Sequence, residues 1–229
     1  MFEKIKKRYA LNNSYFKNCR PQDPQTPNEC FDYLEQHDEL PYNLEEDENW
    51  LEDCFAEYQK RNTDYKLRGQ FFTPPKTAKR MMALLDEYAF KKSPFALDMC
   101  CGYGVLSKDN PFIMKGLDID KNLCELYEKY TENEAINIDF MDYTEKETAV
   151  IANPPYTIKL LTAFLNKLSE TLEKDGVAVL LLPMGFMEKE RPKDTVEVIN
   201  KFEIIYKEKM EEEFSRTKMC AEIVILKLT

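Results

Sequence analysis

From about residue 69 to the end of the chain, short apolar runs alternate with amphipathic stretches of helical length, and this alternation limits the fold most. The apolar runs predict seven strands, at 95–99, 112–118, 135–139, 149–152, 177–182, 202–207 and 221–228. The amphipathic stretches predict helices at 76–90, 122–130, 158–173 and 194–200. Such an alternation specifies an α/β fold with a doubly wound, mostly parallel sheet. Ligands of these sheets bind at the carboxyl ends of the strands.

The first part of the chain has a different composition. Between Arg20 and Lys60 there is no Lys or Arg, so much of the net charge of −10 is concentrated in this acidic segment. Apolar residues here recur at helical spacing, and we expect residues 1–68 to form a small helical appendage, followed by one larger domain over 69–229. The acidic segment has three interpretations: a solvated helical face, a surface for a basic partner, or a DNA-like lid over the active cleft.

Composition also excludes several kinds of chemistry. The seven cysteines include the pair Cys100-Cys101 but form no CxxC motif, so we expect reduced thiols and no metal site. His37 is the single histidine, which argues against histidine-based catalysis. No apolar stretch has membrane-spanning length, and the N-terminus lacks the apolar region of a signal peptide, so we expect a cytoplasmic protein without a membrane partner.

Three successive predicted strands end in an acidic residue. Asp98 ends the first and is followed by the glycines Gly102 and Gly104; Asp118 ends the second, and Asp139 the third. Glycines allow a tight turn and a close approach to a ligand, although the third glycine of the dinucleotide fingerprint is missing. One such acid is usually a helix cap, but three in register indicate a cofactor that carries a nucleoside.

The fourth predicted strand ends in Asn153-Pro154-Pro155-Tyr156. Prolines have no N–H group, so this turn presents carbonyl acceptors without competing donors, beside the oxygen of an Asn side chain and an aromatic face. Acceptors next to a stacking surface suit a planar ring with an exocyclic amine. The alternative is an ordinary exit from a strand.

Another motif, Gly69-Gln70-Phe71-Phe72-Thr73-Pro74-Pro75, precedes the first strand and its helix. We expect Thr73 to be the N-cap and Pro74 the first helical residue, with free N–H groups that can hold a carboxylate. Together with the strand-end acids and residues 153–156, the chain resembles S-adenosylmethionine-dependent methyltransferases that act on amino groups. The motif at 69–75 looks like the one that opens the gamma arrangement of adenine-N(6) DNA methyltransferases.

The resemblance implies a Rossmann-like, seven-stranded class I methyltransferase sheet over 69–229, and an adenine-specific DNA methyltransferase of the kind found in restriction–modification systems. It implies that the cofactor S-adenosyl-L-methionine is bound by Phe71, Phe72, Thr73, Asp98, Gly102, Gly104, Asp118, Asp139 and Phe140. It implies that the catalytic residues are Asn153, Pro154, Pro155 and Tyr156, where Asn153 and Pro154 accept the two N–H bonds of the target amine. Tyr156 and Phe214 would contact a target base that has swung out of its duplex.

Adenine methyltransferases of this arrangement usually carry a separate region that reads the DNA sequence, commonly after the last strand, where this chain ends at Thr229. We therefore expect recognition to come from the N-terminal appendage, from loops, or from a partner such as a specificity subunit that binds the acidic segment, and unaided DNA binding to be weak. Alternatives to DNA are adenine in RNA, the amide of a protein glutamine, or a non-catalytic scaffold that binds the cofactor.

Overall fold

The computed structural model describes residues 73–188, 190–210 and 220–229. The chain divides into two units, 1–72 and 73–229, and the described residues belong to the second. The expected appendage at 1–68 lies outside the described residues, so its boundary stays a prediction.

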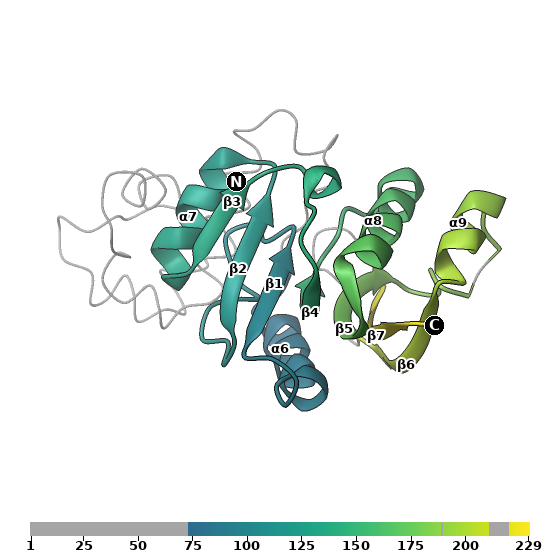
Figure 1. The fold of residues 1–229 in the computed structure, drawn as a ribbon, viewed down its shortest axis with the longest axis horizontal. Helices are drawn as coiled ribbons and strands as arrows, with labels where there is room; N and C mark the ends of the chain where they lie inside the picture. Colours follow the sequence, from purple (N-terminus) through teal and green to yellow (C-terminus); the bar gives the residue numbers. More distant parts are fainter. Residues whose placement is uncertain (1–72, 189, 211–219) are drawn as a thin grey trace, which may run out of the picture. The chain divides into compact units, whose positions relative to one another are not determined.

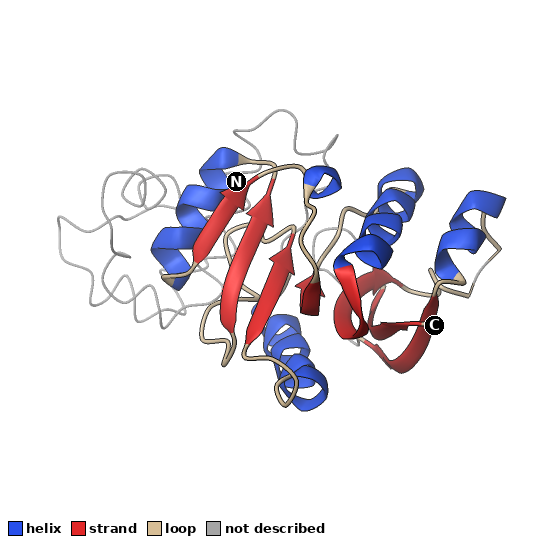
Figure 2. Cartoon of the chain, viewed as in Figure 1, coloured by secondary structure: helices blue, strands red, loops and turns tan. Residues whose placement is uncertain are grey.

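Helices and strands follow one another in an α/β order (Figures 1 and 2). The elements are α6 (Pro75–Ala89), β1 (Phe95–Met99), β2 (Ile113–Asp118), α7 (Lys121–Thr131), β3 (Glu134–Asn137), the 3-10 turn η2 (Phe140–Asp142), β4 (Glu147–Ala152), α8 (Ile158–Thr171), β5 (Leu172–Pro183), α9 (Lys193–Ile199), β6 (Phe202–Lys209) and β7 (Ala221–Leu228).

The strands form one sheet of seven in the order β3-β2-β1-β4-β5-β7-β6. β1 to β5 pair in parallel, while β7 runs antiparallel to both β5 and β6. The predicted α/β, mostly parallel sheet is therefore confirmed. The largest shift in a boundary is at β5, which begins at Leu172 because the backbone becomes extended there, with φ −69° and ψ 133°, directly after α8.

Helices cover both faces of the sheet. On one face, Phe164 and Leu168 of α8 and Val198 of α9 pack on a core that includes Val150 and Leu180. On the other face, α6 packs on the opposite sides of β4, β5 and β7. Each helix within the described ranges is too short or too polar to cross a membrane.

The connection between β1 and β2 breaks the alternation. Residues 100–112 form a series of turns and no helix. α7 supports this loop instead: the ring centroids of Tyr103 and Tyr130 lie 5.8 Å apart, and Lys108 Nζ lies 5.3 Å from the centroid of the Tyr130 ring. A loop that wraps over the end of β1 is thus held by the helix that follows β2.

Candidate active site

The candidate site residues of β1, β2 and β4 meet at one edge of the sheet. Asp98 pairs with Gly116 of β2 on one side and with Ile151 of β4 on the other. Continuing these registers by two residues places Cys100 level with Asp118 and with Asn153. Because all three strands are parallel, the first two strand-end acids and the start of residues 153–156 are neighbours.

Asp98 is a fully buried carboxyl group, with 0% of its surface exposed. Ser107 Oγ donates to its Oδ2 at 2.7 Å, and the Tyr127 hydroxyl donates to Ser107 Oγ at 2.8 Å. Oδ1 is also inaccessible to solvent, and no donor among the described residues reaches it. Burial raises the pKa of Asp98 to about 7; the Ser107 hydrogen bond opposes this rise and the charge of Asp118 adds to it. One buried oxygen is thus left for a donor other than the described residues.

The loop after β1 turns back on the end of β2. Gly102 has φ 54° and donates its N–H to Asp118 Oδ2 at 2.9 Å, while the N–H of Asp120 donates to Oδ1 at 2.9 Å. Two backbone donors thus fix the orientation of the Asp118 carboxylate, and each of its oxygens can accept another hydrogen bond. Gly104 has φ 98° and lies close to α7. Glycine is required at this position, because a Cβ atom there would lie 2.3 Å from Thr131 Cγ2.

Asp98 and Asp118 lie at the ends of β1 and β2, but the third strand is shorter than predicted: β3 ends at Asn137, and Asp139 caps η2 two residues later. All three carboxylates act on one thiol. The pKa of Cys100 is raised well above its ordinary value, mainly by burial and further by the charges of Asp118, Asp98 and Asp139. Three carboxylates can act on one group only if they lie near it. The three acids therefore lie near Cys100, which itself adopts φ 73°.

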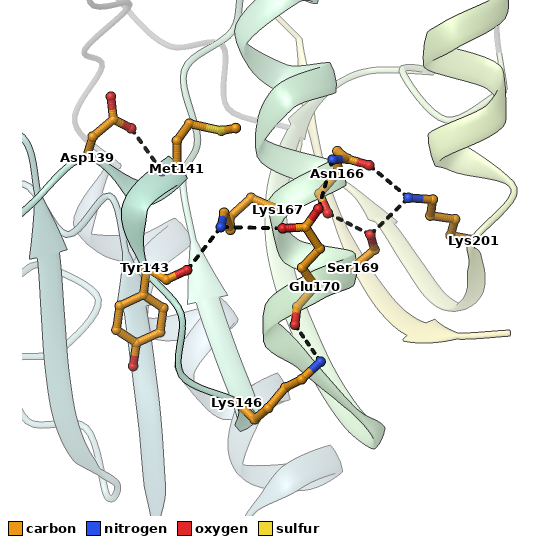
Figure 3. Close-up of polar contacts among 9 residues, drawn as sticks. All are labelled: Asp139, Met141, Tyr143, Lys146, Asn166, Lys167, Ser169, Glu170 and Lys201. Atoms are coloured by element: carbon orange, nitrogen blue, oxygen red, sulfur yellow. Dashed lines mark hydrogen bonds and ion pairs between the residues drawn. The ribbon is translucent and has the colours of Figure 1, made fainter.

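Asp139 and Phe140 lie on a turn that is anchored to α8. Asp139 Oδ1 accepts from the N–H of Met141 at 3.0 Å and so caps η2, and the Phe140 ring packs edge-on against Phe164 of α8 with centroids 5.5 Å apart. Figure 3 shows that Lys167 Nζ of α8 reaches the Tyr143 carbonyl, at 3.0 Å, and the Glu170 carboxylate, at 3.4 Å. The turn beside the acids is thereby fixed to the helix that follows residues 153–156.

Residues 153–156 connect β4 to α8 without regular secondary structure. Asn153 Oδ1 and the Tyr156 hydroxyl are inaccessible to solvent, and burial raises the pKa of Tyr156, so its phenol stays neutral. The Thr157 hydroxyl caps α8 by accepting from the N–H of Leu160 at 3.3 Å. The capped start of α8 thus fixes the C-terminal end of this turn.

One local prediction is wrong. Pro74, and not Thr73, is the N-cap of α6, and Pro75 is the first helical residue. The Thr73 side chain is buried, with 2% of its surface exposed, and makes no capping hydrogen bond. A residue that precedes a proline is disfavoured in the α conformation, and Pro74 is extended, with φ −60° and ψ 142°, so the helix begins at the second proline. Phe71, Phe72 and Phe214 lie outside the described residues.

The structure adds residues that sequence reasoning missed. Ser107 and Tyr127 support Asp98, and Lys167 supports the η2 turn. Ile119 is an exposed apolar side chain, 53% accessible, beside Asp118 at the same edge. Of these residues, only Ile119 could have been found from the sequence, because it is an apolar residue directly after a strand-end acid.

No protein-family model and no curated protein sequence matches the chain. Solved structures do match its fold. A Listeria monocytogenes protein assigned to the class I S-adenosylmethionine-dependent methyltransferases superposes with a TM-score of 0.63 at 16% identity, over 86% of this chain and 70% of that one. The methyltransferase subunit of a type I restriction-modification system from Streptococcus thermophilus gives a TM-score of 0.57 at 18% identity, over 80% of this chain and 50% of that one.

Magnesium protoporphyrin IX methyltransferase from Synechocystis PCC 6803, solved with bound S-adenosylmethionine, gives a TM-score of 0.55 at 15% identity, over 78% of this chain and 95% of that one. The chain spans half the length of the Streptococcus thermophilus subunit. At these identities the similarity concerns the fold alone. The described domain has the fold of class I methyltransferases.

Proposed function

We propose that the protein transfers a methyl group from S-adenosylmethionine to the exocyclic amine of adenine in DNA. One observation carries the proposal: the turn at residues 153–156 adjoins the end of β1, where Asp98 keeps a buried oxygen that no described donor reaches. A site rich in acceptors for a neutral amine thus lies beside a site for a charged nucleoside.

The carboxylates fit the cofactor. The unpartnered Oδ1 of Asp98 suits the ammonium group of its methionine end, since a buried carboxylate is stabilised by a positive partner. Asp118, held by two backbone donors, can accept from the ribose hydroxyls. Asp139 can accept from the adenine amine, and Phe140 and Ile119 offer apolar contacts for the ring. When bound, the cofactor supplies a methyl group that is already activated on a sulfonium.

On the substrate side, the chain needs to orient an amine and does not need a strong base. Asn153 Oδ1 and the Pro154 carbonyl accept the two N–H bonds of the amine, which favours a localised lone pair aimed at the methyl group. Tyr156 stacks on the base after it has left its duplex, and such stacking contributes about 1–3 kcal/mol per base. The neutral phenol of Tyr156 suits this apolar contact.

The choice of DNA rests on the motif at 69–75, most of which lies outside the described residues. The net charge of −10 weakens attraction to phosphates, so we also propose that a specificity subunit or another partner assists DNA binding.

The test is product identification. The purified protein is incubated with labelled S-adenosylmethionine and, separately, duplex DNA, single-stranded DNA, ribosomal RNA and a cell protein extract, and the digested products are identified by mass spectrometry. We expect N(6)-methyladenine from DNA. Asn153→Ala should lower the transfer rate by at least about a hundredfold, because it removes an acceptor that aligns the amine. Asn166→Ala, on the outer part of α8, is the matched control.

Label that appears only in RNA or only in protein would contradict the DNA proposal. Cofactor affinity, measured by calorimetry, should be unchanged in Asn153→Ala. A loss of cofactor binding in that variant would place Asn153 in the cofactor site rather than in the substrate site.

A further inference from the structure

The guanidinium of Arg191, in the loop between β5 and α9, is held in place with most of its donors unused. The Cζ atom of Arg191 lies 4.7 Å from the centroid of the Phe186 ring, and Phe186 is buried, with 2% of its surface exposed. Nη1 donates to the neighbouring carbonyl of Glu190 at 3.3 Å, whereas Nε is inaccessible to solvent and has no acceptor. Stacking uses the face of a guanidinium, and because Nε is buried, the Nη groups form the edge that can donate to an outside anion.

Two other cations at this end of the sheet are already paired with carboxylates. Arg80, the second arginine that the structure describes, donates to Glu208 at 2.8 Å and to the Tyr206 hydroxyl at 2.7 Å. Lys207 pairs with Glu188. Among the described residues, no carboxylate lies within ion-pair distance of Arg191. A positive charge that is ordered but not neutralised is suited to an anion from another molecule.

Packing of α9 on α8 places Arg191 at the edge of the candidate active site. The Thr162 and Thr195 hydroxyls lie 2.9 Å apart, and beyond the end of α9 Lys201 Nζ donates to Asn166 Oδ1 at 2.8 Å (Figures 1 and 3). The two helices therefore run in the same direction, side by side. α8 begins two residues after Tyr156 and α9 two residues after Arg191, so the guanidinium and the proposed base-stacking residue lie at the same end of this helix pair.

We propose that Arg191 binds a backbone phosphate of the nucleic-acid strand next to the target base. This inference rests on the proposed function, because it requires a nucleic-acid substrate. A phosphate accepts two parallel N–H bonds from a guanidinium, and the contact with Phe186 reduces the conformational freedom that the side chain would lose on binding. In a chain with a net charge of −10, one such contact provides a large share of the attraction to the strand.

Salt dependence of binding tests this contact. Fluorescence anisotropy measures the affinity for a labelled, adenine-containing DNA duplex and for a single-stranded RNA between about 50 and about 200 mM salt. In Arg191→Gln the slope of log K against log salt should fall by about 1, and the affinity should fall about tenfold. Arg191→Lys keeps the charge without the planar fork, so it should keep the slope and lose about threefold in affinity.

Lys92→Gln is the matched control, since Lys92 precedes β1 at the opposite end of the sheet and donates to the Asp175 carbonyl at 2.6 Å. It removes the same charge and should leave the slope unchanged. An unchanged slope in Arg191→Gln, or an equal loss in Lys92→Gln, would overturn the proposal. A loss of slope with RNA alone would support the phosphate contact and move the substrate from DNA to RNA.

Cofactor affinity, measured by calorimetry, separates this inference from the proposed function. It should be equal in the wild type and in Arg191→Gln, because Arg191 is not on the cofactor side of the site. A wild-type protein that binds S-adenosylmethionine and methylates protein, but binds no nucleic acid, would refute the DNA function and this contact together. A wild-type protein that methylates DNA with a slope that Arg191→Gln leaves unchanged would refute the phosphate contact alone.

Discussion

Protonation of Asp98 should control the affinity for S-adenosylmethionine across the neutral pH range. The carboxyl group is fully buried, and burial raises its pKa to about 7. Below that pH the group is mostly neutral and above it mostly ionised. Since the ionised form attracts the ammonium group of the cofactor, affinity should rise with pH through about 7.

The size of the effect follows from the ionised fraction. With a pKa of about 7, about one carboxyl in eleven is ionised at about pH 6 and about five in seven at about pH 7.4. An α-amino group has a pKa of about 7.7–8.0 and loses its charge over the range just above, so affinity should be greatest near about pH 7.4. The dissociation constant should be about fivefold to sixfold larger at about pH 6 than at about pH 7.4.

Other titratable groups that face Asp98 do not produce this change. The pKa values of the Cys100 and Cys101 thiols and of the Tyr127 phenol are all raised, chiefly by burial, so these groups stay neutral over this range. Asp118 acts as a nearby charge that adds to the rise in the Asp98 pKa. The pH dependence below about pH 7 should therefore belong to Asp98.

Isothermal titration calorimetry in buffers of different ionisation enthalpy measures both affinity and proton release. Binding should release about 0.9 proton at about pH 6 and about 0.4 at about pH 7. Asp98→Asn should bind weakly with no pH dependence in this range, and Asp109→Asn, an exposed position in the same loop, should behave as the wild type. Ser107→Ala removes a hydrogen bond that lowers the Asp98 pKa and should move the midpoint to higher pH. Affinity that does not change between about pH 6 and about pH 7.5, without proton release, would refute the reasoning.

Two further predictions concern the supports of the site. Gly104→Ala should lower the free energy of unfolding by about 2–3 kcal/mol in thermal denaturation, because the new Cβ would clash with Thr131 and the residue would keep a φ of 98°. An unchanged midpoint would mean that α7 does not constrain the loop. Lys167→Met should cost about 1–3 kcal/mol in urea denaturation, because it leaves the Tyr143 carbonyl without its donor; no loss would show that water replaces the ammonium group.

Elements with strong local signals could be predicted from the sequence. β1 and β7 have the predicted bounds, because each is an apolar run that ends at turn-forming or terminal residues. The closeness of Asp98 and Asp118 follows from the parallel order of β1 and β2, whereas Asp139 lies beyond the end of β3. The start of α6 was misplaced by one residue, because the second proline keeps Pro74 in an extended conformation.

Features that depend on distant contacts could not be predicted. Gly104 was expected to approach a ligand, but its closest neighbours are Thr131 and Tyr127 of α7. Tyr127 has the helical spacing of an ordinary core residue, and nothing local shows that its hydroxyl reaches Ser107. Lys167 would be placed on the solvent side of an amphipathic helix, yet only 9% of it is exposed, because the Tyr143 carbonyl lies opposite.

α8 acts as a spacer between the two halves of the candidate active site. It starts directly after Tyr156 and Thr157, and its middle holds the η2 turn through Phe164 and Lys167. One rigid element therefore fixes the separation between the η2 turn, on the cofactor side, and residues 153–156, on the substrate side. Methyl transfer is sensitive to that separation, since a displacement of about 1 Å costs about a hundredfold in rate. In the proposed reaction, the rate of transfer would thus depend on how α8 packs more than the affinity of either half would.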